Sequence, residues 1–187
     1  MPPRLRGKWA LGIQPRNFTW FMKDKLAVCE RPGGYGDNHR RVRRQEEIIW
    51  LRENRFNCVI SLSPSPHNLH NYDELGVAWL HRPFNPLDNA RASVATFYPE
   101  LRQLLRSGEK LVLHGSELGD GLTGLMAGYL LWTGMVPEGP RAISMMERLT
   151  ACDVSAQVLR VETRAEPKRY LASICSIYLP ISRFWVA

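Results

Sequence analysis

The segment that decides the fold runs from Lys110 to Gly124 and reads KLVLHGSELGDGLTG. It begins with an apolar run that ends at His114 and continues as a glycine-rich loop before a second apolar stretch. A strand, a small-residue loop and a helix N-terminus present several backbone N–H groups to one point, a geometry that binds anions. This loop, however, carries the carboxylates Glu117 and Asp120 and contains no Lys, Arg or Cys. It therefore combines anion-binding geometry with a charge that disfavours an anion.

The same segment resembles the signature of the Cys-dependent dual-specificity phosphatases, His-Cys-x-x-Gly-x-x-Arg-Ser/Thr-Gly. In that family the Cys thiolate attacks a phosphate ester and the Arg clamps the phosphate oxygens. Aligned without a gap, Gly119, Thr123 and Gly124 match the pattern. Ser116 then stands at the position of the Cys, and Leu122 stands at the position of the Arg.

A second register is anchored on His114 and puts Gly115 at the position of the Cys, which makes the loop one residue longer. Both registers lack the nucleophile and the cationic clamp. Under either alignment, the signature loop and candidate ligand-binding residues are His114, Gly115, Ser116, Glu117, Leu118, Gly119, Asp120, Gly121, Leu122 and Thr123.

The N-terminal part of the chain extends this resemblance. Asn17-Phe18-Thr19-Trp20, a turn, and Leu26-Ala27 read as a hairpin and are followed by Arg31-Pro32. The small atypical dual-specificity phosphatases open with a similar series. The resemblance implies a three-layer α/β fold of the tyrosine phosphatase type, in which helices flank a central, mostly parallel sheet.

Hydrophobic patterning leads to the same fold class. Apolar runs predict strands over Phe56–Leu62, Val77–His81 and Leu111–His114, and helical spacing predicts helices over His39–Asn54, Leu69–Leu75, Ala92–Ser107, Leu122–Thr133 and Pro137–Thr150. Strands that alternate with helices favour parallel pairing through crossover connections. We expect a basic N-terminal arm over residues 1–16, a phosphatase-like domain over 17–163, and a C-terminal helix or tail over 164–187.

The first predicted helix has an unusual charge pattern. Arg40, Arg41, Arg43 and Arg44 crowd its first turns, where cations oppose the helix dipole. A solvated basic face linked to Glu46 and Glu47 accounts for this pattern, with Val42 and Ile49 together on one side of the helix. A surface for an acidic partner is the alternative.

Composition limits the classes of function. The chain has 187 residues, is 44% hydrophobic and carries a net charge of +7 from 25 basic and 18 acidic residues. This modest excess of positive charge disfavours nucleic acid as the partner. Four widely spaced cysteines, with no secretory signal and no apolar run long enough to span a membrane, lead us to expect a cytoplasmic protein. No motif implies a metal or a cofactor, and the oligomeric state is left open.

The chemistry left to the loop is limited. Ser116 would need an adjacent base to act as a nucleophile, and His114, on a core strand, reads as a hydrogen-bonded structural residue. In the family, a loop after the preceding strand carries a general-acid Asp; here that position falls on Asn85 or Pro86, with Asp88 the only nearby carboxylate. Asp88 reads equally as a helix cap.

Two functions follow from these substitutions. The first is a catalytically inactive dual-specificity or tyrosine phosphatase-like protein, a pseudophosphatase, that binds a protein partner or small ligand at the remodelled loop. The alternative is an active phosphoric monoester hydrolase of the same superfamily, with Ser116 and Asp88 in the key roles. Because neither register supplies the Cys or the Arg, we expect the first. We also expect Glu117 and Asp120 to fold back onto the loop N–H groups as an internal anion.

Overall fold

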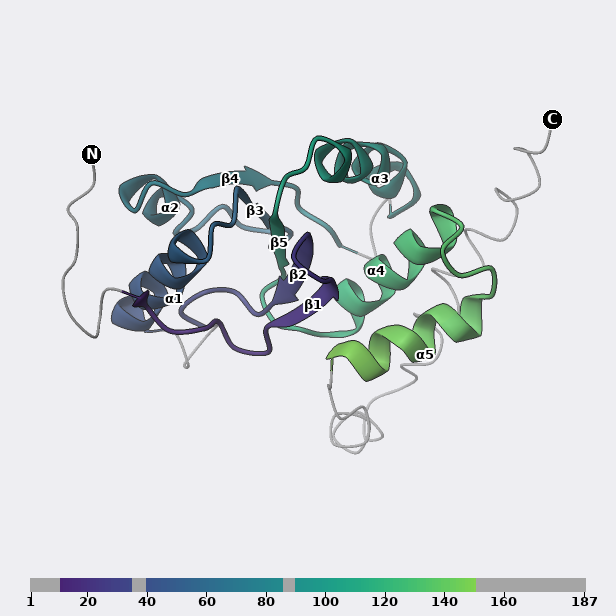
Figure 1. Cartoon of the computed structure of the whole chain (residues 1–187), viewed down its shortest axis with the longest axis horizontal. Helices are drawn as coiled ribbons and strands as arrows, with labels where there is room; N and C mark the ends of the chain where they lie inside the picture. Colours follow the sequence, from purple (N-terminus) through teal and green to yellow (C-terminus); the bar gives the residue numbers. More distant parts are fainter. Residues whose placement is uncertain (1–10, 35–39, 86–89, 151–187) are drawn as a thin grey trace. The chain divides into compact units, whose positions relative to one another are not determined.

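The computed structural model describes residues 11–34, 40–85 and 90–150. Its elements are, in chain order, β1 (Thr19–Met22), β2 (Leu26–Cys29), α1 (Arg41–Glu53), β3 (Cys58–Ser61), α2 (His70–Glu74), β4 (Ala78–His81), α3 (Ala90–Arg106), β5 (Leu111–His114), α4 (Asp120–Trp132) and α5 (Gly139–Thr150). The chain forms two compact units: one is drawn from Met1–Pro83 and Leu101–Leu118, the other from Phe84–Glu100 and Gly119–Ala187. Figure 1 shows the path of the chain.

The first unit is built on a five-stranded sheet with the order β1-β2-β5-β3-β4. The β1–β2 hairpin is antiparallel, whereas β5 pairs in parallel with β2 on one side and with β3 on the other, and β3 pairs in parallel with β4. The strand Leu111–His114 is therefore central, and all four of its residues are buried. The prediction of an α/β fold with a central, mostly parallel sheet is confirmed.

One face of this sheet is covered by α1 and α2 (Figure 1). The buried cluster on this face contains Ala27, Cys29, Ile48, Leu51, Phe56, Val59, Leu69, Tyr72, Val77 and Val112. Along β2 and β5 its members are alternate residues, because successive side chains of a strand point to opposite faces. The same alternation directs the last residue of β5, His114, toward α2.

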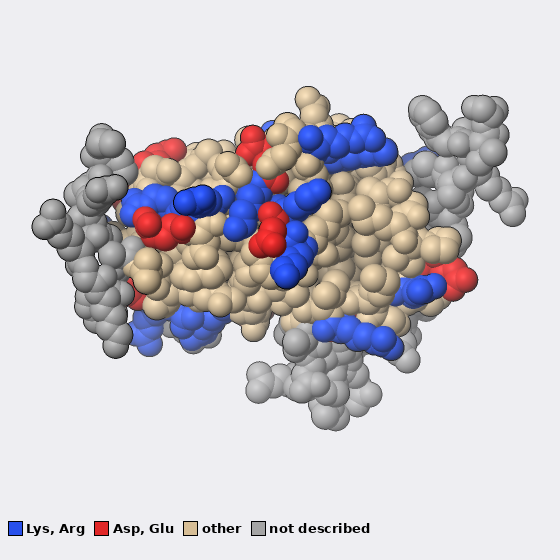
Figure 2. All heavy atoms as spheres, viewed as in Figure 1, with Lys and Arg blue, Asp and Glu red and all other residues tan. Residues whose placement is uncertain are grey.

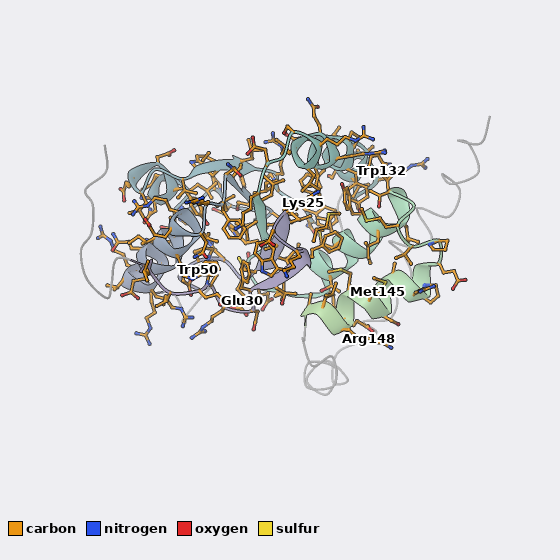
Figure 3. The ribbon with its side chains drawn as sticks, in the orientation of Figure 1. Lys25, Glu30, Trp50, Trp132, Met145 and Arg148 are labelled. Atoms are coloured by element: carbon orange, nitrogen blue, oxygen red, sulfur yellow. The ribbon has the colours of Figure 1, made fainter. Side chains whose placement is uncertain are left out.

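Aromatic rings close the N-terminal side of this cluster. Trp50 of α1, labelled in Figure 3, lies 5.1 Å from Phe18 between ring centroids, and Phe18 lies 5.3 Å from Trp20. The ammonium group of Lys110 lies 4.8 Å from the ring centroid of Phe56 and 5.2 Å from that of Trp20. These contacts fasten the β1–β2 hairpin to α1 and to the start of β5.

The second unit is centred on α4, whose residues from Leu122 to Leu130 are all buried. Tyr98 of α3 donates a hydrogen bond of 2.7 Å from its hydroxyl to the carbonyl of Leu125. Its ring also makes an edge contact with Tyr129, at 5.4 Å between centroids. An apolar helix without a polar face needs such cover on several sides.

The prediction for α1 is wrong in its details. Val42, placed on one side with Ile49, is 68% exposed, whereas Arg44 and Glu47 are only 6% and 1% exposed. The basic face is therefore not fully solvated. The helix turns two charged side chains inward because polar partners from outside it, Asn71 and the backbone of Gly33, receive them.

Several predictions fall on residues that the structure does not describe. They concern residues 1–10 of the basic arm, the tail 164–187, and the positions Pro86 and Asp88. Within the described ranges, none of the helices has the length and apolar character needed to cross a bilayer.

Candidate functional site

The carboxyl ends of β2, β5, β3 and β4 form the sheet edge from which the signature loop departs. Cys29, His114, Ser61 and His81 end these strands and lie opposite one another in register. In open α/β sheets, binding sites lie at the carboxyl ends of parallel strands, where loops leave the sheet together. We call these four residues, together with the loop residues from Gly115 to Leu118, the loop edge.

His114 is buried at the end of β5, and its hydrogen bonds hold the start of the loop in place. It is 1% exposed, its Nδ1 lies 3.2 Å from the carbonyl of Gly115, and its Nε2 lies 3.2 Å from the hydroxyl of Tyr72. The carbonyl can only accept, so Nδ1 carries the proton and Nε2 accepts from Tyr72. Burial lowers the pKa of His114 to about 4, so the ring is neutral at physiological pH. The prediction that His114 is a hydrogen-bonded structural residue is confirmed.

The loop turns tightly after His114. A side-chain carbon added to Gly115 would lie 3.0 Å from the carbonyl oxygen of Glu117. Beyond this turn Ser116 is half-buried, Glu117 is exposed and Leu118 is 2% exposed. The backbone N–H of Leu62, after β3, donates to the carbonyl of His114 at 2.9 Å and so ties the two neighbouring loops together.

The expectation that Glu117 and Asp120 form an internal anion is wrong. Both are exposed, and neither carboxylate forms a hydrogen bond with a described residue. Gly119, the N-cap residue of α4, has no side chain that could cap the helix. Asp120 stands in the first turn of α4, where the helix dipole favours a negative charge that remains in water. Hydration is available to both carboxylates at no conformational cost, which explains why they do not fold back.

The position of the missing clamp is also structural. Leu122 is 6% exposed, and Thr123 beside it is equally buried. An arginine clamp would have to leave the interior to reach a ligand, whereas Leu122 contributes to the buried face of α4. In the register aligned without a gap, the position of the family's arginine therefore falls on a core residue of this chain.

Among the described residues, no reactive thiol lies at the loop edge. Cys29, next to His114 in the sheet, is fully buried, and burial raises the pKa of its thiol far above its ordinary value. It therefore remains protonated and unreactive. Cys58 forms no disulfide with a described residue and is half-buried, and it lies at the opposite end of the sheet, opposite Leu111.

Two arginines that sequence reasoning did not assign to the site lie beside the loop edge. Arg31 follows β2 and donates through Nη2 to the carbonyl of His67. Arg44 of α1 donates through Nε to Oδ1 of Asn71 at 3.0 Å. With the amide oxygen of Asn68 turned toward them, that oxygen accepts from Arg31 Nη2 and from Arg44 Nη1, each at 3.3 Å.

The sequence contained one signal for Arg31. It stands two residues after a strand that pairs in parallel with β5, so its backbone had to reach the same sheet edge as Ser116. No local pattern indicates that Asn68 and Asn71 fold back onto α1. Figure 3 labels Glu30, the residue before Arg31, at the end of β2.

Two serine hydroxyls at the ends of the strands have no hydrogen-bond partner in the described part of the chain. They are Oγ of Ser61, which is fully buried, and Oγ of Ser63, which is 2% exposed. The carbonyl of Ser63 accepts a hydrogen bond of 2.8 Å from Nε2 of His81, which fixes the backbone there. Buried hydroxyls without partners are uncommon, and they supply donors to a bound group. Among the described residues, no cluster of His, Cys, Asp or Glu has metal-ligand geometry.

No protein-family model matches the sequence, and no curated protein matches it by sequence. Solved structures do resemble it. Kinase associated phosphatase, solved with a serine in place of its catalytic-site cysteine, has a TM-score of 0.61 and 19% identity over 73% of this chain and 84% of that chain. Human DUSP28 has a TM-score of 0.58 and 13% identity over 91% and 99% of the two chains.

A third similar structure is TpbA from P. aeruginosa, solved with a cysteine replaced by serine and in complex with phosphotyrosine. Its TM-score is 0.59, with 14% identity over 95% of this chain and 94% of that chain. These likenesses establish a fold of the dual-specificity and tyrosine phosphatase type. At such identities they establish the fold alone, since one fold hosts many functions.

Proposed function

We propose that this chain is a phosphatase-like protein that does not hydrolyse phosphoesters and that acts by binding a partner or ligand at the loop edge. The observation that carries this proposal is the pair of substitutions at the signature loop: Ser116 stands where the thiolate is required, and the buried Leu122 stands where the guanidinium is required. Phosphoryl transfer depends on positioning and charge stabilisation, and loss of one arginine of this kind costs about 10³–10⁵-fold in rate.

The surroundings of Ser116 support the absence of turnover. A serine nucleophile needs a base that accepts its proton. Both ring nitrogens of His114 are engaged, with Tyr72 and with the carbonyl of Gly115, and Nε2 of His81 is engaged with Ser63. Because the pKa of His114 is lowered to about 4, its ring is also a weak base.

Binding without turnover is consistent with this fold. TpbA holds phosphotyrosine in a form in which a cysteine is replaced by serine. For the present chain, the half-buried Ser116, the unpartnered hydroxyl of Ser63 and the nearby Arg31 support a ligand at the same sheet edge. The alternative, an active phosphatase with a non-standard loop, is favoured by the fold and would require Ser116 as nucleophile.

The deciding experiment is hydrolysis of an aryl phosphate such as para-nitrophenyl phosphate by the purified chain. We expect no turnover above that of Ser116→Ala, because neither a thiolate nor a guanidinium is present at the loop. Robust turnover that Ser116→Ala abolishes would overturn the proposal and establish the alternative.

A variant that carries both signature residues tests whether their absence explains the lack of turnover. Ser116→Cys combined with Leu122→Arg supplies both missing groups, and we expect at most a trace of activity, because position 122 is buried. The matched control is Ser116→Cys alone, which adds the thiol without the clamp and should show none. High activity of the single variant would show that the clamp is dispensable here.

A further inference from the structure

Arg31 is the feature of the loop edge that the missing signature residues do not explain. Among the described residues, its guanidinium contacts neutral oxygens, the carbonyl of His67 and the amide oxygen of Asn68. No carboxylate of the described residues forms an ion pair with it. The partly exposed guanidinium of Arg31 thus leaves a positive charge at the strand ends that an anion can offset.

A second arginine lies beside Arg31. Arg44, 6% exposed, donates to the same oxygen of Asn68. The charge of Arg31 contributes to the lowered pKa values of both Arg44 and His114, after the larger effect of burial. The field of Arg31 thus reaches the residue at which the signature loop begins.

The fold places this cation beside the loop. Cys29 lies opposite His114 in the parallel pair of β2 and β5, so Arg31 and Ser116 each follow a paired residue by two positions. Ser63 follows Ser61, which pairs with the other side of His114, by the same number. The guanidinium, the loop N–H groups and the unpartnered hydroxyl of Ser63 therefore belong to three neighbouring strand ends.

We propose that Arg31 is the anion-binding residue of the loop edge and that it binds a singly charged carboxylate, the Asp or Glu side chain of a protein partner. A guanidinium matches a carboxylate with two parallel hydrogen bonds. Glu117 of the same loop adds a negative charge, which disfavours a phosphate dianion more than a singly charged carboxylate. This inference rests on the proposed function and names the chemistry of its partner.

The test is an NMR titration of the full chain with two acetylated, amidated octapeptides, (Gly-Glu)₄ and (Gly-Gln)₄, at matched ionic strength. We expect the Glu peptide to shift the Nε–Hε signal of Arg31 and the backbone amides of residues 115–118 saturably, and the Gln peptide to leave them in place. Equal shifts with both peptides, or none with either, would overturn the proposal.

Variants of Arg31 test whether its positive charge binds the Glu peptide. Arg31→Gln should weaken binding of the Glu peptide by about 10-fold or more, whereas Arg31→Lys, which keeps the charge but not the paired geometry, should lose less. Arg52→Gln is the matched control, because Arg52 belongs to the same unit and pairs with Glu53. If Arg31→Gln does not fold, the site-resolved signal of Arg31 in the unaltered chain still decides. Equal binding by Arg31→Gln would overturn the assignment.

A peptide in which one Glu is replaced by phosphotyrosine, and the rest by Gln, tests whether the site prefers a carboxylate or a phosphate ester. We expect it to bind more weakly than the Glu peptide. Tighter binding would replace the carboxylate with a phosphate ester as the ligand. Hydrolysis of para-nitrophenyl phosphate would overturn the proposed function but would not affect the peptide-binding result for Arg31. Failure of the proposed function and failure of the Arg31 assignment can therefore be told apart.

Discussion

At the scale of single residues, the loop edge is organised by buried polar groups rather than by reactive ones. His114 orients the carbonyl of Gly115 and accepts from Tyr72, whose pKa burial raises well above its ordinary value. Both groups are neutral at physiological pH, and each satisfies the other. A neutral pair of this kind holds a loop in place without adding charge under its ligand.

The lowered pKa of His114 predicts how stability depends on pH. The unfolded chain binds a proton near 6.5, whereas the folded chain does so only near 4, so the unfolded state holds more protons between these values. Stability is therefore fully present above pH 6.5, falls as the pH drops toward 4, and loses about 3 kcal/mol from this group. Chemical denaturation at a series of pH values measures it.

The control for this prediction is His114→Gln, whose amide can donate to the carbonyl of Gly115 and does not titrate. This variant should lose the part of the pH dependence that lies between 4 and 6.5. His67→Gln, at an exposed position, should keep it. An unchanged pH profile in His114→Gln would assign the dependence to other groups.

At the scale of elements, the strands were more predictable than the packing of α1. Leu111–His114 was predicted with the bounds that the structure has, because a short apolar run between a turn and a glycine-rich loop leaves little freedom. The loop site was predictable as a location, since a strand end before glycines lies at a sheet edge. The inward turn of Arg44 and Glu47 was not, because their partners come from Gly33 and Asn71, distant in sequence.

The buried carboxylate of Glu47 yields a prediction at this scale. One of its oxygens accepts from the backbone N–H of Gly33 at 2.7 Å, and the other accepts from Nε of Arg43 at 2.6 Å. Glu47→Gln keeps the shape and loses the charge, so we expect a loss of about 1.5–3 kcal/mol in the free energy of unfolding. Urea denaturation measures it.

Glu53→Gln is the matched control, because Glu53 lies at the end of the same helix and its side chain is 39% exposed in its pair with Arg52. We expect this change to alter the free energy of unfolding by less than about 1 kcal/mol. Equal losses in the two variants would mean that the bond to Gly33 adds nothing to the attachment of α1.

At the scale of the whole molecule, the fold is held by features that many sequences share. Structures only 13–19% identical to this chain cover 73–95% of it with TM-scores of 0.58–0.61. A core of apolar residues tolerates wide substitution when its volume and pattern are kept. Figure 2 shows basic and acidic side chains interspersed on the face in view, so the net charge of +7 does not form one uniform patch on that face.

The central position of β5 predicts that truncation there is severe. Leu113 is fully buried and has a strand on each side. Leu113→Ala should lower the free energy of unfolding by about 2–5 kcal/mol through lost burial and the cavity left behind. The control is Leu11→Ala, since Leu11 is 67% exposed and should change stability little. Thermal or urea unfolding compares the two, and a small loss at Leu113 would contradict a central β5.

The tight turn at Gly115 limits which position of the loop can accept a reactive side chain. In the register anchored on His114, a nucleophile would have to arise at Gly115, where its first side-chain carbon would lie 3.0 Å from the carbonyl oxygen of Glu117. That change requires the turn to open. At Ser116, exchange of one oxygen for sulfur suffices, but it brings no benefit until the buried Leu122 is also rebuilt. Adding a thiol to this loop is therefore simpler at Ser116 than at Gly115, and it leaves position 122 in the core.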